Sequence, residues 1–140
     1  MRLCWRHRAA HEIDHELIWL AVSTAAMAAG TAWLALGLTW PRCPFLVLTG
    51  LPCVTCGATR STVAFLHGHF LSALGWNPLA FFALVSLLIF DLYAAVVLIS
   101  GRPRLRIVDS STVEKNVVRI AVVCLLALNW IYLLAQRSRF

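Results

Sequence analysis

Charged side chains are scarce in this sequence, and the few that it has are unevenly distributed. Asp, Glu, Lys and Arg make up only 13% of the 140 residues, whereas 61% are hydrophobic. A water-soluble domain carries nearer a quarter charged residues, so the polar surface that would face water is missing. None of the four charged types occurs in residues 17–41, 61–90 or 120–136. The sequence therefore predicts an all-α membrane protein.

Motifs of the common enzyme classes are also missing. The chain has no Gly-rich phosphate-binding loop, no paired-carboxylate site and no Ser-His-Asp set that could converge in a short segment. The net charge of +6 could indicate nucleic-acid binding, but the basic residues adjoin the apolar stretches instead of forming one patch. Membrane topology and anionic lipid headgroups explain that arrangement. The sequence gives little support for an enzyme of these classes, and we expect no nucleic-acid partner.

Three apolar stretches predict three membrane-spanning helices. They cover about residues 17–40, 78–99 and 117–135. The first is longer than the apolar region of a signal peptide, about 7–15 residues, so we expect it to be retained as a helix. Asn77 and Pro78 supply a preferred cap and first turn for the second helix. The predicted organisation is a cytosolic segment over residues 1–16 and a single membrane domain over residues 17–140.

The Lys and Arg distribution predicts the orientation of these spans. With three spans, residues 1–16 share a side with the loop 101–116, and residues 41–77 share the other side with the C-terminal segment. The basic residues are Arg2, Arg6, Arg8, Arg102, Arg104, Arg106 and Lys115 on the first side, against Arg42, Arg60, Arg137 and Arg139 on the second. Because cytoplasmic loops carry the excess, the N-terminus is predicted to be cytoplasmic and residues 41–77 to lie outside.

Three of the five cysteines, Cys43, Cys53 and Cys56, lie in this outer connecting segment. Apolar residues recur at helical spacing after them, at Val63, Leu66, Phe70 and Leu74. We expect an amphipathic helical segment in the outer interface, which Gly68 divides into two short helices. A helix beginning near Cys56 would place its thiol beside unpaired N–H groups and near Arg60, and both favour a thiolate.

The cysteine segment allows three interpretations. A disulfide from Cys43 to Cys53 or Cys56, or a structural thiol cluster, could shape the loop on the oxidising side. A three-sulfur, one-nitrogen set could instead hold a metal ion. Candidate ligands for zinc or iron are Cys43, Cys53, Cys56, His67 and His69. Finally, Cys53 and Cys56, assisted by Arg60, could be the catalytic pair of a membrane thiol oxidoreductase.

Asp91 is the only acidic residue inside a predicted span. A mid-membrane Asp costs about 3 kcal/mol, so a partner is expected. Arg119 begins the third span at a level that can reach it, and we expect an Asp91–Arg119 pair that holds two helices together. A proton or ion relay is the alternative. Since three helices do not enclose a sizeable channel, a homo-oligomer or a membrane-protein partner is also expected.

The connecting segment resembles a known family. The residues that carry the resemblance are Cys43-Pro44-Phe45, Gly50-Leu51-Pro52-Cys53, Cys56-Gly57, Thr59-Arg60 and Asn77-Pro78-Leu79. In this order they resemble an uncharacterised bacterial membrane family, domain of unknown function 2752, over about residues 43–82. The resemblance implies a small bacterial inner-membrane protein and supplies no activity or substrate. The chain departs from the family pattern at Val54, where Pro is usual, and at His69, where Asp is frequent.

The sequence thus predicts a small integral membrane protein of the cell inner membrane. We expect a binding or accessory role in which the outer cysteine cluster holds a metal ion. The alternatives are a thiol oxidoreductase that uses Cys53 and Cys56 and a structural subunit whose disulfide staples the loop.

Overall fold

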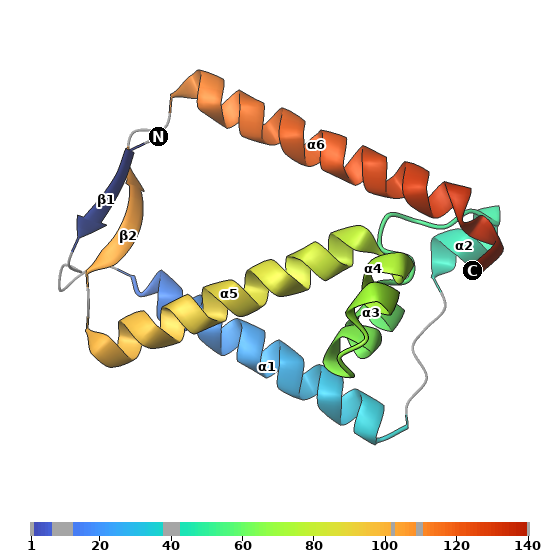
Figure 1. Ribbon diagram of the computed structural model, residues 1–140, viewed down its shortest axis with the longest axis horizontal. Coiled ribbons are helices and arrows are strands. Elements are labelled where there is room, and N and C mark those ends of the chain that lie inside the picture. Colours follow the sequence, from blue (N-terminus) through green and yellow to red (C-terminus); the bar gives the residue numbers. More distant parts are fainter. Residues whose placement is uncertain (1, 7–12, 38–42, 102, 109–110, 140) are drawn as a thin grey trace. The chain divides into compact units, whose positions relative to one another are not determined.

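The computed structural model describes residues 2–6, 13–37, 43–101, 103–108 and 111–139. Its elements in chain order (Figure 1) are β1 (Arg2–Arg6), α1 (His15–Ala35), α2 (Pro44–Thr49), α3 (Ala58–Leu66), α4 (Phe70–Trp76), α5 (Pro78–Ser100), β2 (Arg104–Val108), α6 (Thr112–Ala135) and the short 3-10 helix η1 (Arg137–Arg139). Most described residues are helical, as the sequence predicted.

The chain forms two compact units, which are described separately. The hairpin unit comprises residues 1–39 and 87–115, and the cysteine unit comprises residues 40–86 and 116–140. Helices α5 and α6 each contribute one end to each unit. The single membrane domain expected over residues 17–140 stays a prediction.

Two helices are long and apolar enough to cross a membrane. These are α5, with a mean hydropathy of 2.6, and α6, with 2.3. Only 11% of the apolar window of each is buried, whereas a helix in a soluble core hides its apolar face. In the described residues this gives two candidate spans where the sequence predicted three. The first predicted span forms α1, which is not one of these two.

The hairpin unit also contains one short antiparallel strand pair beside its helices. Strand β1 pairs with β2 in a register that runs from Arg2 opposite Val108 to Arg6 opposite Arg104. Basic and apolar residues alternate in β2, Arg-Leu-Arg-Ile-Val, and a period of two is the pattern of a strand. The first residues of the segment predicted to be cytosolic thus form a strand, because a partner from far along the chain pairs with them.

A buried ion-pair cluster lies beside this strand pair. Arg104 Nη1 lies 2.7 Å from Asp14 Oδ1 and 3.0 Å from Glu16 Oε2. The hydrogen bond that Arg104 donates to Asp14 raises the pKa of Arg104, which burial alone would lower. Because Arg104 and Glu16 are both buried, each charge depends on the other for compensation. The cluster fixes the start of α1 against the start of β2.

Asp91 has a partner on the first long helix. Ser23 Oγ of α1 donates a 2.8 Å hydrogen bond to Asp91 Oδ1 of α5, and Ser23 is buried. The bond holds α1 to α5 through a polar pair, which is how transmembrane helices commonly use Ser. Arg119 belongs to the cysteine unit, and its predicted pairing with Asp91 stays a prediction.

Side-chain caps set the ends of the two apolar helices. Asn77 Oδ1 accepts a 3.0 Å bond from the Ala80 N–H at the start of α5, as predicted. Helix α6 begins five residues before the predicted residue 117, at Thr112, because Ser111 and Glu114 form a reciprocal capping box. The spacing Ser-x-x-Glu is the signal that could have located this start.

In the cysteine unit, α3 and α4 pack against each other. Gly68 separates them with a positive φ of 77°, so the predicted division into two short helices is confirmed. The Ser61 hydroxyl of α3 donates a 2.8 Å bond to the Ala73 carbonyl of α4, and both residues are fully buried. This bond fixes the angle between the two helices that follow the cysteine segment.

Candidate cysteine centre

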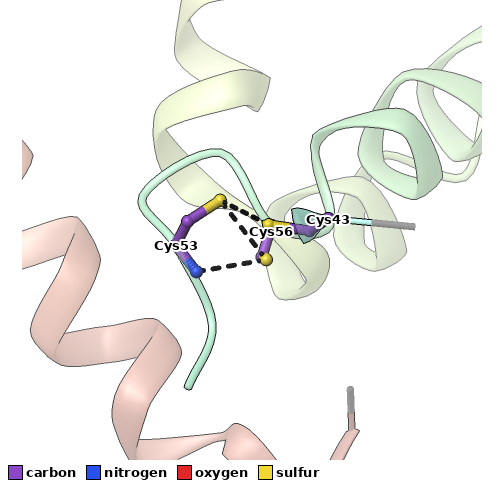
Figure 2. A group of neighbouring side chains, drawn as sticks. All are labelled: Cys43, Cys53 and Cys56. Atoms are coloured by element: carbon purple, nitrogen blue, oxygen red, sulfur yellow. Dashed lines mark hydrogen bonds between the residues drawn. The ribbon is translucent and has the colours of Figure 1, made fainter. Parts of the chain in front are cut away.

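Three thiols converge in the cysteine unit (Figure 2). The Sγ of Cys53 lies 3.3 Å from that of Cys43 and 3.4 Å from that of Cys56. All three sulfur atoms lie within 4.8 Å of one another, and all three cysteines are free. The sequence gathered these residues in one segment, and the fold brings their sulfur atoms to one point. We call this group the cysteine centre.

Two tight turns in the backbone produce this convergence. Cys43 directly precedes α2, and Gly50, with φ of 69°, ends that helix and reverses the chain. The segment from Cys53 to Cys56 is a second turn, closed by a 3.0 Å bond from the Cys56 N–H to the Cys53 carbonyl. Gly57 follows with φ of 78°, a conformation that strongly favours glycine, and leads into α3. These two turns therefore bring Cys43 next to Cys53 and Cys56.

Hydrogen bonds from outside the turn hold its carbonyl groups. They run from Asn77 Nδ2 to the carbonyls of Val54 (3.1 Å) and Cys56 (3.0 Å), from Asn129 Nδ2 to that of Val54 (3.1 Å), and from Trp130 Nε1 to that of Pro52 (2.9 Å). Asn77 and Asn129 are buried. Sequence reasoning identified Asn77 only as a helix cap and gave Asn129 and Trp130 no part in the site. A polar Asn inside an apolar span was the available signal, because such a residue requires a partner.

The two cysteines of the Cys-x-x-Cys pair differ in acidity. Burial raises the pKa of Cys53, but hydrogen bonds from Thr55 and the neighbouring thiols outweigh it and lower that pKa to about 7. Burial raises the pKa of Cys56 to about 12, and its hydrogen bond with Cys53 adds to the rise. The prediction that the Cys56 thiolate would be favoured is wrong. Helix α3 begins only at residue 58, so Cys56 precedes its first turn and lies buried instead.

The predicted histidine ligands are not part of the cysteine centre. Among the described residues, the ligand atoms that gather there come from the three cysteines alone. His67 Nδ1 is 2.8 Å from the Val63 carbonyl, and both His67 and His69 line a groove with Arg60. Arg60 itself lies over the Trp76 ring and donates to the Arg139 carbonyl. The fold thus brings together three of the five predicted metal ligands and places the others elsewhere in the unit.

Comparison with known proteins bears on the same segment. No curated protein and no solved structure matches the chain. One family model, described as Protein of unknown function (DUF2752), matches residues 43–90. This range holds the cysteine centre, α3, α4 and the first half of α5. The resemblance predicted from the cysteine motif is therefore confirmed, and residues 43–90 are similar to this family.

Proposed function

We propose that this protein is a three-span inner-membrane protein whose outward-facing cysteine centre binds a metal ion, zinc or iron. The observation that supports the proposal is the approach of three free sulfur atoms within 4.8 Å. Tetrahedral zinc with Zn–S bonds of about 2.3 Å separates its sulfur ligands by about 3.8 Å. The separations of 3.3 and 3.4 Å are close to that value and more than about 1 Å longer than a covalent S–S bond.

Acidity and ligand number also favour a metal. Metal ligands are thiolates, and Cys53, with a pKa of about 7, is half ionised near neutral pH. The Cys56 proton is lost on coordination, since a metal-bound thiol is deprotonated outright. Three protein ligands leave a fourth position for water or for a group on a partner. That open position fits a binding or accessory role better than a closed structural site.

Contacts within each unit support the three-span topology. Because β1 pairs with β2, the chain crosses the membrane an even number of times between them. Helix α5 supplies one of those crossings, so α1 supplies the other. The Tyr132 hydroxyl near the end of α6 donates to the Gly75 carbonyl (3.1 Å), which puts both on one side. Three spans satisfy both contacts, and the Lys and Arg excess then places the cysteine centre outside.

Elemental analysis of the purified protein tests the metal proposal. We expect at least about half an equivalent of zinc or iron, and its loss in the Cys43→Ser, Cys53→Ser and Cys56→Ser variants. Cys124→Ser is the matched control, because Cys124 is a free, exposed cysteine on α6 outside the centre. Absence of metal from the unsubstituted protein, or unchanged metal content in the triple Ser variant, would contradict the proposal.

Labelling of whole cells with a membrane-impermeant thiol reagent tests the orientation. After mild reduction, Cys53 is expected to react and Cys4, on the cytoplasmic side, to be protected. The reverse pattern would show that the topology is inverted.

A membrane thiol oxidoreductase is the second candidate, because the acidities of Cys53 and Cys56 suit a nucleophile and a resolving thiol 3.4 Å apart. The Cys53 thiolate would attack a partner's disulfide, forming a mixed disulfide and releasing one partner thiolate. Cys56 would lose its proton and attack the Cys53 sulfur, releasing the second. The partner gains two electrons, and the pair ends as a disulfide.

Redox titration distinguishes these candidates. An exchange-active pair has a potential well above roughly −300 mV, and Cys56→Ser then traps the mixed disulfide. A potential below that value without bound metal indicates a structural disulfide that only shapes the loop.

A further inference from the structure

The acidic side chains are confined to one of the two units, whereas basic side chains occur in both. Every Asp and Glu of the chain lies in residues 1–39 or 87–115, so the cysteine unit has no acidic side chain in its sequence. Its basic side chains are Arg42, Arg60, Arg119, Arg137 and Arg139, together with His67 and His69. No carboxylate side chain of the cysteine unit therefore balances its positive charge.

Two of these arginines converge on one tryptophan. The guanidinium of Arg60 lies over the Trp76 ring, 4.6 Å from its centre, and its Nη1 donates a 3.3 Å bond to the Arg139 carbonyl. Arg139 Nη1 lies above Gly75, 3.9 Å from the position that a Cβ would occupy there. Because the cysteine unit has no carboxylate side chain, the positive charge of these two arginines favours an external anion.

Trp76 lines two hollows of the surface. One hollow, of about 450 Å³, is lined by Thr59, Arg60, His67, His69 and Trp76 among others. A second, of about 590 Å³, is lined by Leu71, Ser72, Gly75, Trp76 and Arg139. We call the two together the Trp76 groove. It offers guanidinium, hydroxyl and imidazole groups, and guanidinium is the side chain best matched to phosphate oxygens.

We propose that the Trp76 groove binds the phosphodiester headgroup of an anionic phospholipid, with Arg60 and Arg139 as its charged donors. Leu71 lines the groove and is 87% exposed. Leu66, at the end of α3, and Phe70, at the start of α4, are 54% and 53% exposed and adjoin the groove residues His67 and His69 in sequence. These side chains suit the acyl chains of a lipid, and Trp is enriched at the level of lipid headgroups. The anion site stands on the groove's own geometry, and its lipid identity rests on the proposed membrane location.

Native mass spectrometry of the full chain in detergent tests this proposal. Short-chain phosphatidylglycerol and phosphatidylcholine are titrated in parallel, and inorganic phosphate is titrated by calorimetry. We expect phosphatidylglycerol to bind more tightly, and Arg60→Gln and Arg139→Gln each to weaken it about tenfold, the loss of one charge-assisted hydrogen bond. Lys115→Gln is the matched control, because it removes the same charge from an exposed residue of the hairpin unit.

The arms of the experiment separate the possible results. Arginine-dependent binding of inorganic phosphate as tight as that of the lipid supports the anion site and identifies free phosphate as its source. Arg60→Lys, which keeps the charge, is expected to retain part of the binding and controls for folding. Equal affinity for the two lipids, or a preference for phosphatidylglycerol that persists in the folded Arg60→Gln and Arg139→Gln variants, overturns the proposal. The metal content of the cysteine centre is expected to be unchanged in both variants.

Discussion

Replacement of Asn129 by Ala tests how the third long helix supports the cysteine centre. The Asn129 side chain accepts a 3.1 Å bond from the Leu79 N–H at the start of α5 and donates a 3.1 Å bond to the Val54 carbonyl. In Asn129→Ala the Val54 carbonyl keeps a second donor, Asn77, whereas the Leu79 N–H loses its side-chain acceptor. A side-chain hydrogen bond in a membrane protein contributes about 0.6 kcal/mol on average, and a buried donor left unsatisfied costs about 1–3 kcal/mol. We therefore expect a loss of about 1–3 kcal/mol.

Equilibrium unfolding in mixed detergent micelles measures this loss, and thiol alkylation reports on the cysteine centre. Asn129→Ala is expected to destabilise the protein and to speed the alkylation of Cys56, because the turn that buries Cys56 loses one support. Asn129→Asp keeps an acceptor for the Leu79 N–H but turns a carboxylate, which cannot donate, toward the Val54 carbonyl. It therefore distinguishes the contribution of the Leu79 bond from that of the Val54 bond. Leu128→Ala is the control, since Leu128 is 63% exposed on the adjacent position of α6. A stability loss no larger than that of Leu128→Ala, with unchanged alkylation, would refute the reasoning.

Three further predictions concern other parts of the chain. Gly57→Ala forces a side chain into a left-handed conformation, with a cost of about 1–2 kcal/mol and a loss of bound metal, whereas Gly30→Ala, in open helical surroundings, keeps the metal. In protein stripped of metal, alkylation of Cys53 rises with pH to a midpoint near 7, because the thiolate is the nucleophile and its pKa is about 7; a midpoint near 9 in peptide mapping would contradict this. Arg104→Met leaves two buried carboxylates without their cation and costs about 3–5 kcal/mol in the same unfolding assay, whereas Lys115→Met costs less than about 0.5 kcal/mol.

Local signals predicted the parts of the fold that depend on local physics. Runs of apolar residues predicted α5 and α6, since about 20 such residues match the thickness of a bilayer core. Asn77 capped α5 and Gly68 separated α3 from α4, because each acts on the backbone within a few residues. The pairing of β1 with β2 was missed, since it joins segments about 100 residues apart and its alternation is only five residues long.

Prediction of the cysteine centre shows the same limit. The spacing of Cys53 and Cys56 and the nearby Cys43 were enough to expect that their thiols meet. Which residues would complete the site was not predictable, because His67 and His69 follow the cysteines closely in sequence but lie beyond the turn at Gly57. The acidity of the pair was assigned to the wrong cysteine, since it depends on burial and on the direction of hydrogen bonds.

The sequence by itself determined that the chain is built of apolar helices, that its charged residues flank the apolar stretches, and that three thiols share one connector. These properties follow from composition and from interactions over a few residues. Only the tertiary structure decided that Asn129 and Trp130 of α6 hold the cysteine turn, that Cys53 is the acidic thiol, and that Arg60 and Arg139 meet at Trp76. The support of the turn and the position of Arg60 and Arg139 depend on groups from distant parts of the chain, which packing brings together. The acidity of Cys53 depends on its burial and on how the turn places Thr55, Cys43 and Cys56 around its sulfur atom.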